Sequence, residues 1–191
     1  MKNILLAILG LVGVALVLGV LTWVGIWDDL SALGMGIEPE VYKAFAGMCT
    51  VENPKDLPER VRGVERAADF SASQGAHPLV ALTTSGDFYE SASSLPRGWN
   101  PDAISDTQLV LCITKERLDL PAPPFPICYH NVDRAAGRRV GLFAARSGKK
   151  LWTGDFYHYY EPCVGNTVDE TPLSIIISQI QSNIAEGNIK P

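Results

Sequence analysis

Charged side chains are missing from the start of this sequence. Between Asn3 and Trp27 there is no Asp, Glu, Lys or Arg. As a helix, the apolar run from Ile4 to Trp27 would be roughly 36 Å long at about 1.5 Å per residue. A bilayer core of about 30 Å needs about 20 apolar residues. The run therefore predicts a transmembrane anchor over residues 1–27.

A cleaved secretory signal peptide is the alternative, because Met1 and Lys2 form a short positive start. The apolar part of a signal peptide runs for about 7–15 residues and ends at a cleavage site of small residues. Here the run is longer and ends in the bulky Trp23 and Trp27. This difference favours an uncleaved anchor over a signal peptide.

The residues that flank the run predict its orientation. Lys2 lies before it, whereas Asp28 and Asp29 follow it. Basic residues stay on the cytoplasmic side of a membrane. We therefore expect a single-pass protein of the cell membrane with its N-terminus inside and the rest of the chain extracytoplasmic. Membrane lipid is then one partner. Ala15 and Gly19 are spaced for helix pairing, but membrane helices contain such pairs by chance, so a plain anchor is favoured. An unidentified envelope protein is the alternative partner.

The sequence also has fewer basic residues than acidic ones. Lys and Arg number 16 against 21 Asp and Glu, and the net charge is −5. Nucleic-acid-binding domains carry a clustered basic surface. The balance of charges predicts that nucleic acid is not a partner.

Histidine is rare, and recognisable catalytic or metal-binding motifs are absent. The three histidines are His77, His130 and His158. Their spacing from Cys128 and Cys163 matches no ligand pair of a zinc site, so we expect no metal and no cofactor. The sequence also has no G-x-S-x-G elbow. A binding or structural role of unknown specificity is favoured over catalysis. The alternative is an anchored or secreted hydrolase that uses His77 or His130.

The cysteines are few but even in number. Four of them, Cys49, Cys112, Cys128 and Cys163, follow the predicted anchor. In an oxidising compartment they predict two disulfides with three possible connectivities. A hairpin centred near Leu120 would place Cys112 opposite Cys128, where side chains are close enough to bridge. We therefore expect a Cys112–Cys128 and a Cys49–Cys163 disulfide.

Hydrophobic patterns predict one domain over residues 41–191, after a connector over residues 28–40. Short apolar runs predict buried strands, a Ser-Gly-Lys turn between two alternating segments predicts a hairpin, and a run of apolar residues at three- and four-residue spacing predicts a helix. Residues 59–67 fit a half-exposed strand or a frayed helix, and Gly63 favours the strand. The other expected elements are strands at 78–83 and 108–113, a third strand that begins at 127–129, the hairpin 139–146 with 150–157, and a helix over 172–187. Together they predict an α+β fold, in which one α/β sandwich domain has a mostly antiparallel sheet and a C-terminal covering helix.

Aromatic residues are concentrated near the predicted end of the hairpin. Trp152, Tyr157, Tyr159 and Tyr160 lie close together in the sequence. Core packing accounts for such a cluster in most domains. If the rings are exposed together, they would form a contact patch for a protein or a carbohydrate.

Several short motifs carry a resemblance. They are HPLVAL at 77–82, LPRGW at 95–99, QLVLC at 108–112, ICY at 127–129, A-x-S-G at 145–148 and EPC at 161–163. Over about residues 60–165 the chain resembles a group of prokaryotic extracytoplasmic, membrane-anchored proteins whose domains have no assigned function. The resemblance implies an extracytoplasmic setting and this order of strands. It implies no activity, cofactor or catalytic residue.

Overall fold

A computed structural model of the chain describes residues 36–53, 55–72, 75–89, 95–114, 135–159 and 173–191. For residues 135–136 and 157–159 it describes only the backbone. The predicted anchor and most of the connector lie outside these ranges. Within them, no helix combines the length and the apolar character that crossing a bilayer requires.

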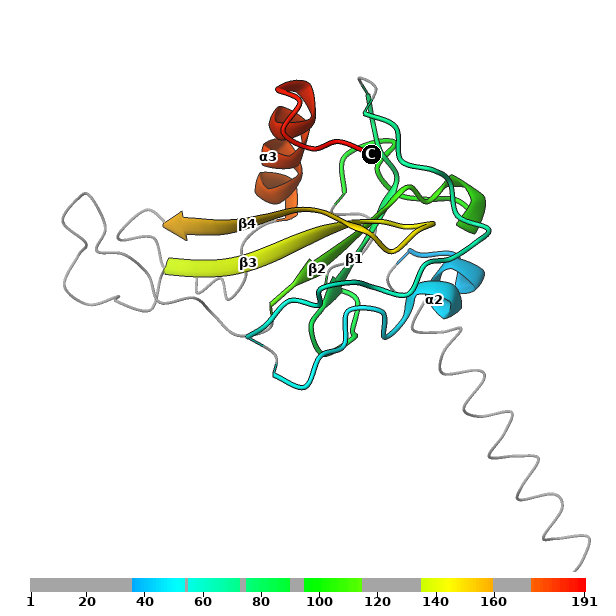
Figure 1. Ribbon diagram of the computed structural model, residues 1–191, viewed down its shortest axis with the longest axis horizontal. Helices are drawn as coiled ribbons and strands as arrows, with labels where there is room; N and C mark the ends of the chain where they lie inside the picture. The colour runs from blue at the N-terminus through cyan, green and yellow to red at the C-terminus, as the bar shows by residue number, and fades with distance from the viewer. Residues whose placement is uncertain (1–35, 54, 73–74, 90–94, 115–134, 160–172) are drawn as a thin grey trace, which may run out of the picture.

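A four-stranded sheet forms the centre of the domain (Figure 1). Its strands lie side by side in the order in which they occur along the chain. β1 pairs with β2 in parallel, whereas the β2–β3 and β3–β4 pairs are antiparallel. The prediction of an α+β fold with a mostly antiparallel sheet is confirmed. The strands are β1 Leu79–Thr83, β2 Leu109–Ile113, β3 Ala135–Ala144 and β4 Lys150–Tyr159.

The two short strands, β1 and β2, are apolar because both of their faces are covered. Every residue of β2 is buried, and in β1 only Thr83 is partly exposed. A strand buried on both sides has a continuous apolar sequence instead of an alternating one. This is why the runs at 78–83 and 108–113 predict these strands well.

The predicted hairpin is confirmed as β3 and β4. Gly148 has a φ of +68° in the turn between them, a backbone conformation that glycine adopts without steric cost. The Gly148 amide donates to the Ala144 carbonyl at 2.8 Å, and the Ala144 amide donates to the Lys149 carbonyl at 2.9 Å. These two bonds close the turn, and the register of the two strands then shifts once, between Leu142 and Phe143.

Helices cover both faces of the sheet (Figure 1). Helix α3, Leu173–Ala185, buries Ile176, Ile177 and Ile180 against one face. The short helix α2, Pro39–Phe45, buries Val41 and Phe45 against the other. The predicted C-terminal covering helix is thus present, and the sheet is the middle layer of three. A 3₁₀ turn, η2, spans Ile104–Asp106 in the connection between β1 and β2.

The strand expected over residues 59–67 is wrong. This segment forms one isolated bridge, from Arg60 to Lys149, and belongs to no named strand. It runs along the hairpin turn, where the Val64 amide donates to the Ala145 carbonyl at 2.9 Å. A Cβ at Gly63 would overlap the Arg146 carbonyl, so the close approach of the two backbones requires glycine there. The alternation of charged and apolar residues here reflects packing on the turn and not a sheet ladder.

Candidate functional site

One disulfide joins the loop after α2 to the centre of the sheet. Cys49 and Cys112 have Cα atoms 5.5 Å apart and are separated by 63 residues in the sequence. Both side chains are fully buried among the residues that pack under α2. Such burial is typical of a structural disulfide instead of a reactive one.

The expected pairings of Cys112 with Cys128 and of Cys49 with Cys163 are therefore wrong. They assumed a hairpin between β2 and the segment just after it. Instead β2 pairs with β3, and Cys112 lies opposite Gly141 in that ladder. Cys128 and Cys163 lie outside the described residues.

The aromatic cluster divides in two. Trp152 is partly buried, and its ring meets Phe156 edge to face with the centroids 5.9 Å apart. A Cβ at Gly154 would overlap the Trp152 ring, so the ring lies directly over the glycine. Trp152 therefore contributes to packing on the α3 side of the sheet. Tyr157 and Tyr159 belong to β4 with undescribed side chains, and Tyr160 lies outside the described residues, so their role in a contact patch stays a prediction.

His77 lies in the core. Its side chain is only 2% exposed. The Nδ1 atom is 3.0 Å from the Gln108 side-chain oxygen, and the ring meets the rings of Phe70 and Trp99 edge to face. A catalytic imidazole must be able to reach a substrate. This position therefore fits a packed and hydrogen-bonded histidine. His130 lies outside the described residues, and of His158 only the backbone is described.

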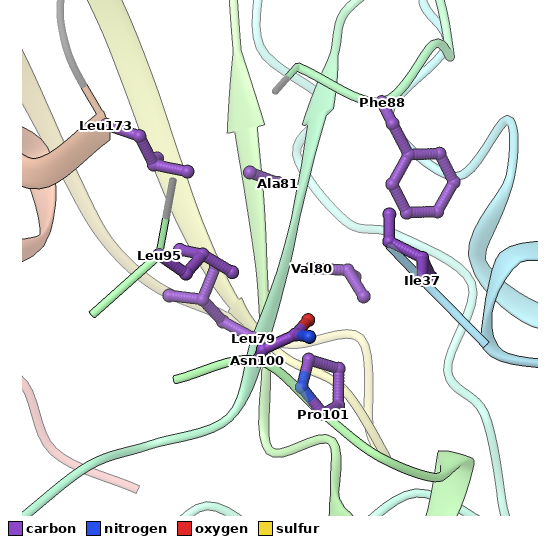
Figure 2. A pocket seen from close by; sticks show the side chains of 9 residues that line it. All are labelled: Ile37, Leu79, Val80, Ala81, Phe88, Leu95, Asn100, Pro101 and Leu173. Atoms are coloured by element: carbon purple, nitrogen blue, oxygen red, sulfur yellow. The ribbon is translucent and has the colours of Figure 1, made fainter. Parts of the chain in front are cut away.

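An apolar gap follows the outer edge of β1 (Figure 2). Leu95 and Leu173 lie on one side of the strand, and Ile37 and Phe88 lie on the other. Its volume is about 10 Å³, which is about the room that one water molecule needs. The gap is too small to hold a ligand.

The chain itself closes this gap at both ends. The Tyr89 amide donates to the Ala81 carbonyl at 2.9 Å, and the Leu79 amide donates to the Trp99 carbonyl at 2.9 Å. An added peptide strand needs a longer open edge than the stretch between these bonds. The gap is therefore a packing feature, and the candidate site is elsewhere.

A larger and polar cavity opens where β1 and β2 end. It has a volume of about 360 Å³, within the range of small-molecule sites. Side chains reach it from the end of β1 and the turn after it, from the residue after β2, and from the start of β3. We call it the Arg138 cleft; it is lined by Thr83, Ser85, Asp87, Phe88, Tyr89, Thr114 and Arg138.

Arg138 supplies a buried positive charge to this cleft. The side chain is only 7% exposed, although it lines a cavity that opens to solvent. Arg138 lies opposite Phe156 in the β3–β4 ladder, so the two side chains share the sheet face that α3 covers. A guanidinium is protonated at every physiological pH. The wall of the cleft is thus permanently cationic at this point.

The backbone next to Arg138 is fixed by Thr114. The Thr114 amide donates to the Arg139 carbonyl at 2.9 Å. The Arg139 amide in turn donates to Thr114 Oγ1 at 3.1 Å. The hydroxyl oxygen of Thr114 therefore accepts the bond that a main-chain carbonyl would accept if β2 continued. These two bonds fix the backbone of β3 next to Arg138.

A chain of hydrogen bonds orders the polar rim. Ser85 Oγ donates to Asp87 Oδ2 at 2.7 Å, and Thr83 Oγ1 lies 2.8 Å from Ser85 Oγ. The Thr83 amide donates to the Asp87 carbonyl at 2.7 Å. Both Ser85 and Asp87 are exposed. The rim therefore presents hydroxyl groups and one carboxylate in a fixed arrangement.

The turn that carries this rim packs on the loop after α2. Gly86 has a φ of +93°, and a Cβ built there would be 2.5 Å from Thr50 Oγ1. The Val51 amide also donates to the Thr84 carbonyl at 3.3 Å. The same loop contains Cys49, so the disulfide and the rim belong to one connected part of the fold.

Arg139, the next residue of β3, has an exposed side chain, whereas that of Arg138 is buried. Its Nε and Nη2 atoms donate to the two carboxylate oxygens of Asp155 at 2.7 and 3.0 Å. These bonds, with the charge of Arg139, lower the pKa of Asp155 from its ordinary value, while partial burial opposes the change. The two adjacent arginines thus point to opposite faces of β3. Arg139 makes a surface ion pair, and Arg138 lines the cleft.

Sequence reasoning missed Arg138 and Thr114. The predicted strand began at Arg139, one residue too late to include Arg138. The signal that could have found it is the Arg138–Arg139 pair itself, because adjacent residues of a strand point to opposite faces. One arginine of such a pair must point toward the helix-covered face. Ser85 and Asp87 lie in the turn that follows β1.

The chain matches no protein-family model, no curated protein and no solved structure.

Proposed function

We propose that this chain is a single-pass membrane protein whose extracytoplasmic domain binds a small, carboxylate-bearing solute in the Arg138 cleft. The observation that carries the proposal is the buried guanidinium in the wall of a cavity of about 360 Å³. A guanidinium donates charge-assisted hydrogen bonds to carboxylates. A carboxylate-bearing solute therefore matches the chemistry of this wall of the cleft.

Two observations support the proposed location. The uncharged run from Ile4 to Trp27 is long enough to cross a bilayer. The buried Cys49–Cys112 disulfide fits a domain that folds in an oxidising compartment. An unidentified envelope protein stays a possible second partner of the anchor.

The position of His77 supports binding over the hydrolase alternative. Two aromatic rings and the Gln108 amide surround its imidazole, and it is almost fully buried. The cleft itself is lined by Ser85 and Asp87 instead of by this histidine. A site that positions hydroxyl groups around an arginine is suited to holding a ligand in place.

The test compares Arg138→Gln with Arg139→Gln in the full-length protein. Each variant removes one arginine from the same strand, but only Arg138 lines the cleft. Acetate, propionate and inorganic phosphate serve as probes, and thermal unfolding measures binding, since a ligand of the folded state raises the melting temperature. We expect carboxylates to stabilise the wild type and Arg139→Gln but not Arg138→Gln.

Arg138→Lys provides a second variant in case glutamine disturbs the fold. It keeps the charge but loses the bidentate fork, so the carboxylate response should fall without disappearing. Absence of any carboxylate response in the wild type would overturn the proposal. An equal response in Arg138→Gln would also overturn it, because binding would then occur elsewhere.

A further inference from the structure

A second charge of opposite sign lies in the same cleft. Asp87 lines it from the turn after β1, whereas Arg138 lines it from the start of β3. The two residues are far apart in the sequence and meet at one cavity only because β1, β2 and β3 are neighbours in the sheet. A ligand that fills the cleft therefore lies between a basic and an acidic residue of its lining.

The two charges lie at different depths. Arg138 is 7% exposed, whereas Asp87 is exposed at the rim. An anionic group would therefore enter first, and a cationic group would stay near the mouth. This order assigns an orientation to any ligand that carries both charges.

Asp87 has capacity for a further donor. A carboxylate accepts about four hydrogen bonds. The Asp87 side chain accepts one from Ser85 at its Oδ2 atom, which orients the group. The remaining positions suit an ammonium group, which donates three hydrogen bonds.

From this arrangement we infer that the ligand is a small zwitterion of the amino-acid class, with its carboxylate at Arg138 and its ammonium group at Asp87. The inference rests on the proposed function and names the chemistry of the ligand. Phe88 also lines the cleft and is partly exposed. Its ring offers an apolar contact to the side chain of such a ligand.

Three probes of matched size test the inference. L-Alanine carries both charges, propionate carries only the carboxylate, and ethylamine carries only the ammonium group. Titration calorimetry with the full-length protein gives the dissociation constant of each. We expect L-alanine to bind about tenfold more tightly than propionate, since a hydrogen bond between charged groups adds to the affinity. Ethylamine should bind more weakly than either.

Asp87→Asn then removes the charge at the rim, and Asp102→Asn is the matched control. Asp102 is exposed and does not line the cleft. In Asp87→Asn the advantage of L-alanine over propionate should disappear. Asp102→Asn should keep the full advantage. Asp87→Glu, which restores the charge, should recover part of it.

The outcomes separate this inference from the proposed function. If propionate binds as tightly as L-alanine to the wild type, the cleft binds anions and the inference is wrong, while the proposed function stands. If Asp87→Asn keeps the preference for L-alanine, the assignment of Asp87 is wrong. If neither carboxylate binds, both proposals are overturned.

Discussion

The Gly47 amide donates a hydrogen bond to the Gly86 carbonyl at 3.1 Å. This bond ties the loop after α2 to the turn that carries Ser85 and Asp87. Because Cys49 lies in the same loop, the disulfide to β2 restrains the rim of the cleft indirectly. The disulfide and the rim of the proposed ligand site are therefore connected through the main-chain contacts of a few residues.

Gly86→Ala should destabilise the domain by about 3 kcal/mol, the upper range for a single substitution. The φ of +93° disfavours any side chain, and a Cβ would be 3.0 Å from Gly47 Cα. Gly187→Ala is the control, because Gly187 has a φ of +73° with open space around its Cβ position. In Gly187→Ala, conformational strain alone should lower the free energy of unfolding by about 1 kcal/mol. Urea unfolding measures both, and equal losses would mean that the contact with the loop is unimportant.

Replacement of both Cys49 and Cys112 by alanine should lower the free energy of unfolding by about 4 kcal/mol. The disulfide closes a loop of 63 residues, and this estimate follows from the restriction of the unfolded chain. Urea unfolding of wild type and variant under oxidising conditions gives the difference. A stability equal to that of the wild type would contradict a structural role for this bond.

Peptide mapping of the unreduced protein should recover Cys49 linked to Cys112. The two remaining cysteines, Cys128 and Cys163, are then expected to link to each other if the domain is extracytoplasmic. Mass spectrometry after proteolysis at acidic pH, where disulfides do not exchange, identifies each linked pair. Alkylation of all four cysteines in the native protein would refute both bonds and the oxidising location.

Ile177→Ala should cost about 2–5 kcal/mol, because removal of buried methyl groups leaves a cavity. Ile177 is fully buried under α3, whereas Ile175 in the same helix is 36% exposed. Ile175→Ala should therefore change stability by less than about 0.5 kcal/mol. Similar losses in the two variants would show that α3 does not pack on the sheet through the face described here. Thermal or urea unfolding is sufficient for the comparison.

The Arg139–Asp155 pair should make a small part of the stability depend on pH. The lowered pKa of Asp155 in the folded state means that its contribution is present above its unfolded value, about 3.9. The contribution is lost as the pH falls through the lowered folded pKa. Both side chains are substantially exposed, so the effect should stay below about 1 kcal/mol.

Asp155→Asn provides the measurement. Melting temperatures of wild type and variant should differ by a constant amount above about pH 5. The difference should shrink as the pH falls below the unfolded pKa of about 3.9 and vanish below the lowered pKa of the folded state, where the wild-type carboxylate is protonated in both states. Curves that stay parallel to the lowest pH at which both proteins fold would contradict the assignment. Arg139→Gln should reproduce the behaviour of the Asp155 variant.

Patterns within short segments predicted several elements correctly. The apolar runs at Leu79–Thr83 and Leu109–Ile113 became strands, and Gly148 marks the predicted hairpin turn. The spacing of Ile176, Ile177 and Ile180 predicted the buried face of α3. Each of these features depends on residues that are neighbours in the sequence, so the sequence of one protein is enough to predict it.

Features that join distant segments were predicted poorly. Cys112 was assigned to the cysteine nearest in the expected hairpin, whereas its partner is Cys49. The physical cause of this error is that strands pair so that whole faces of the sheet become buried. Proximity along the chain does not decide which strand pairs with β2. Arg138 was missed for a related reason, since its environment comes from β1, the residue after β2, and β3 together.

The amino-acid sequence by itself determined the uncharged leading run, the class of the fold, the two short apolar strands, the hairpin and the amphipathic C-terminal helix. Each follows from the periodicity or composition of adjacent residues. Only the tertiary structure decided that β1 and β2 are parallel, that Cys49 bonds to Cys112 and that Asp87 and Arg138 line one cleft. Those relationships arise when both faces of a sheet are covered at once, which brings together side chains that no local pattern connects.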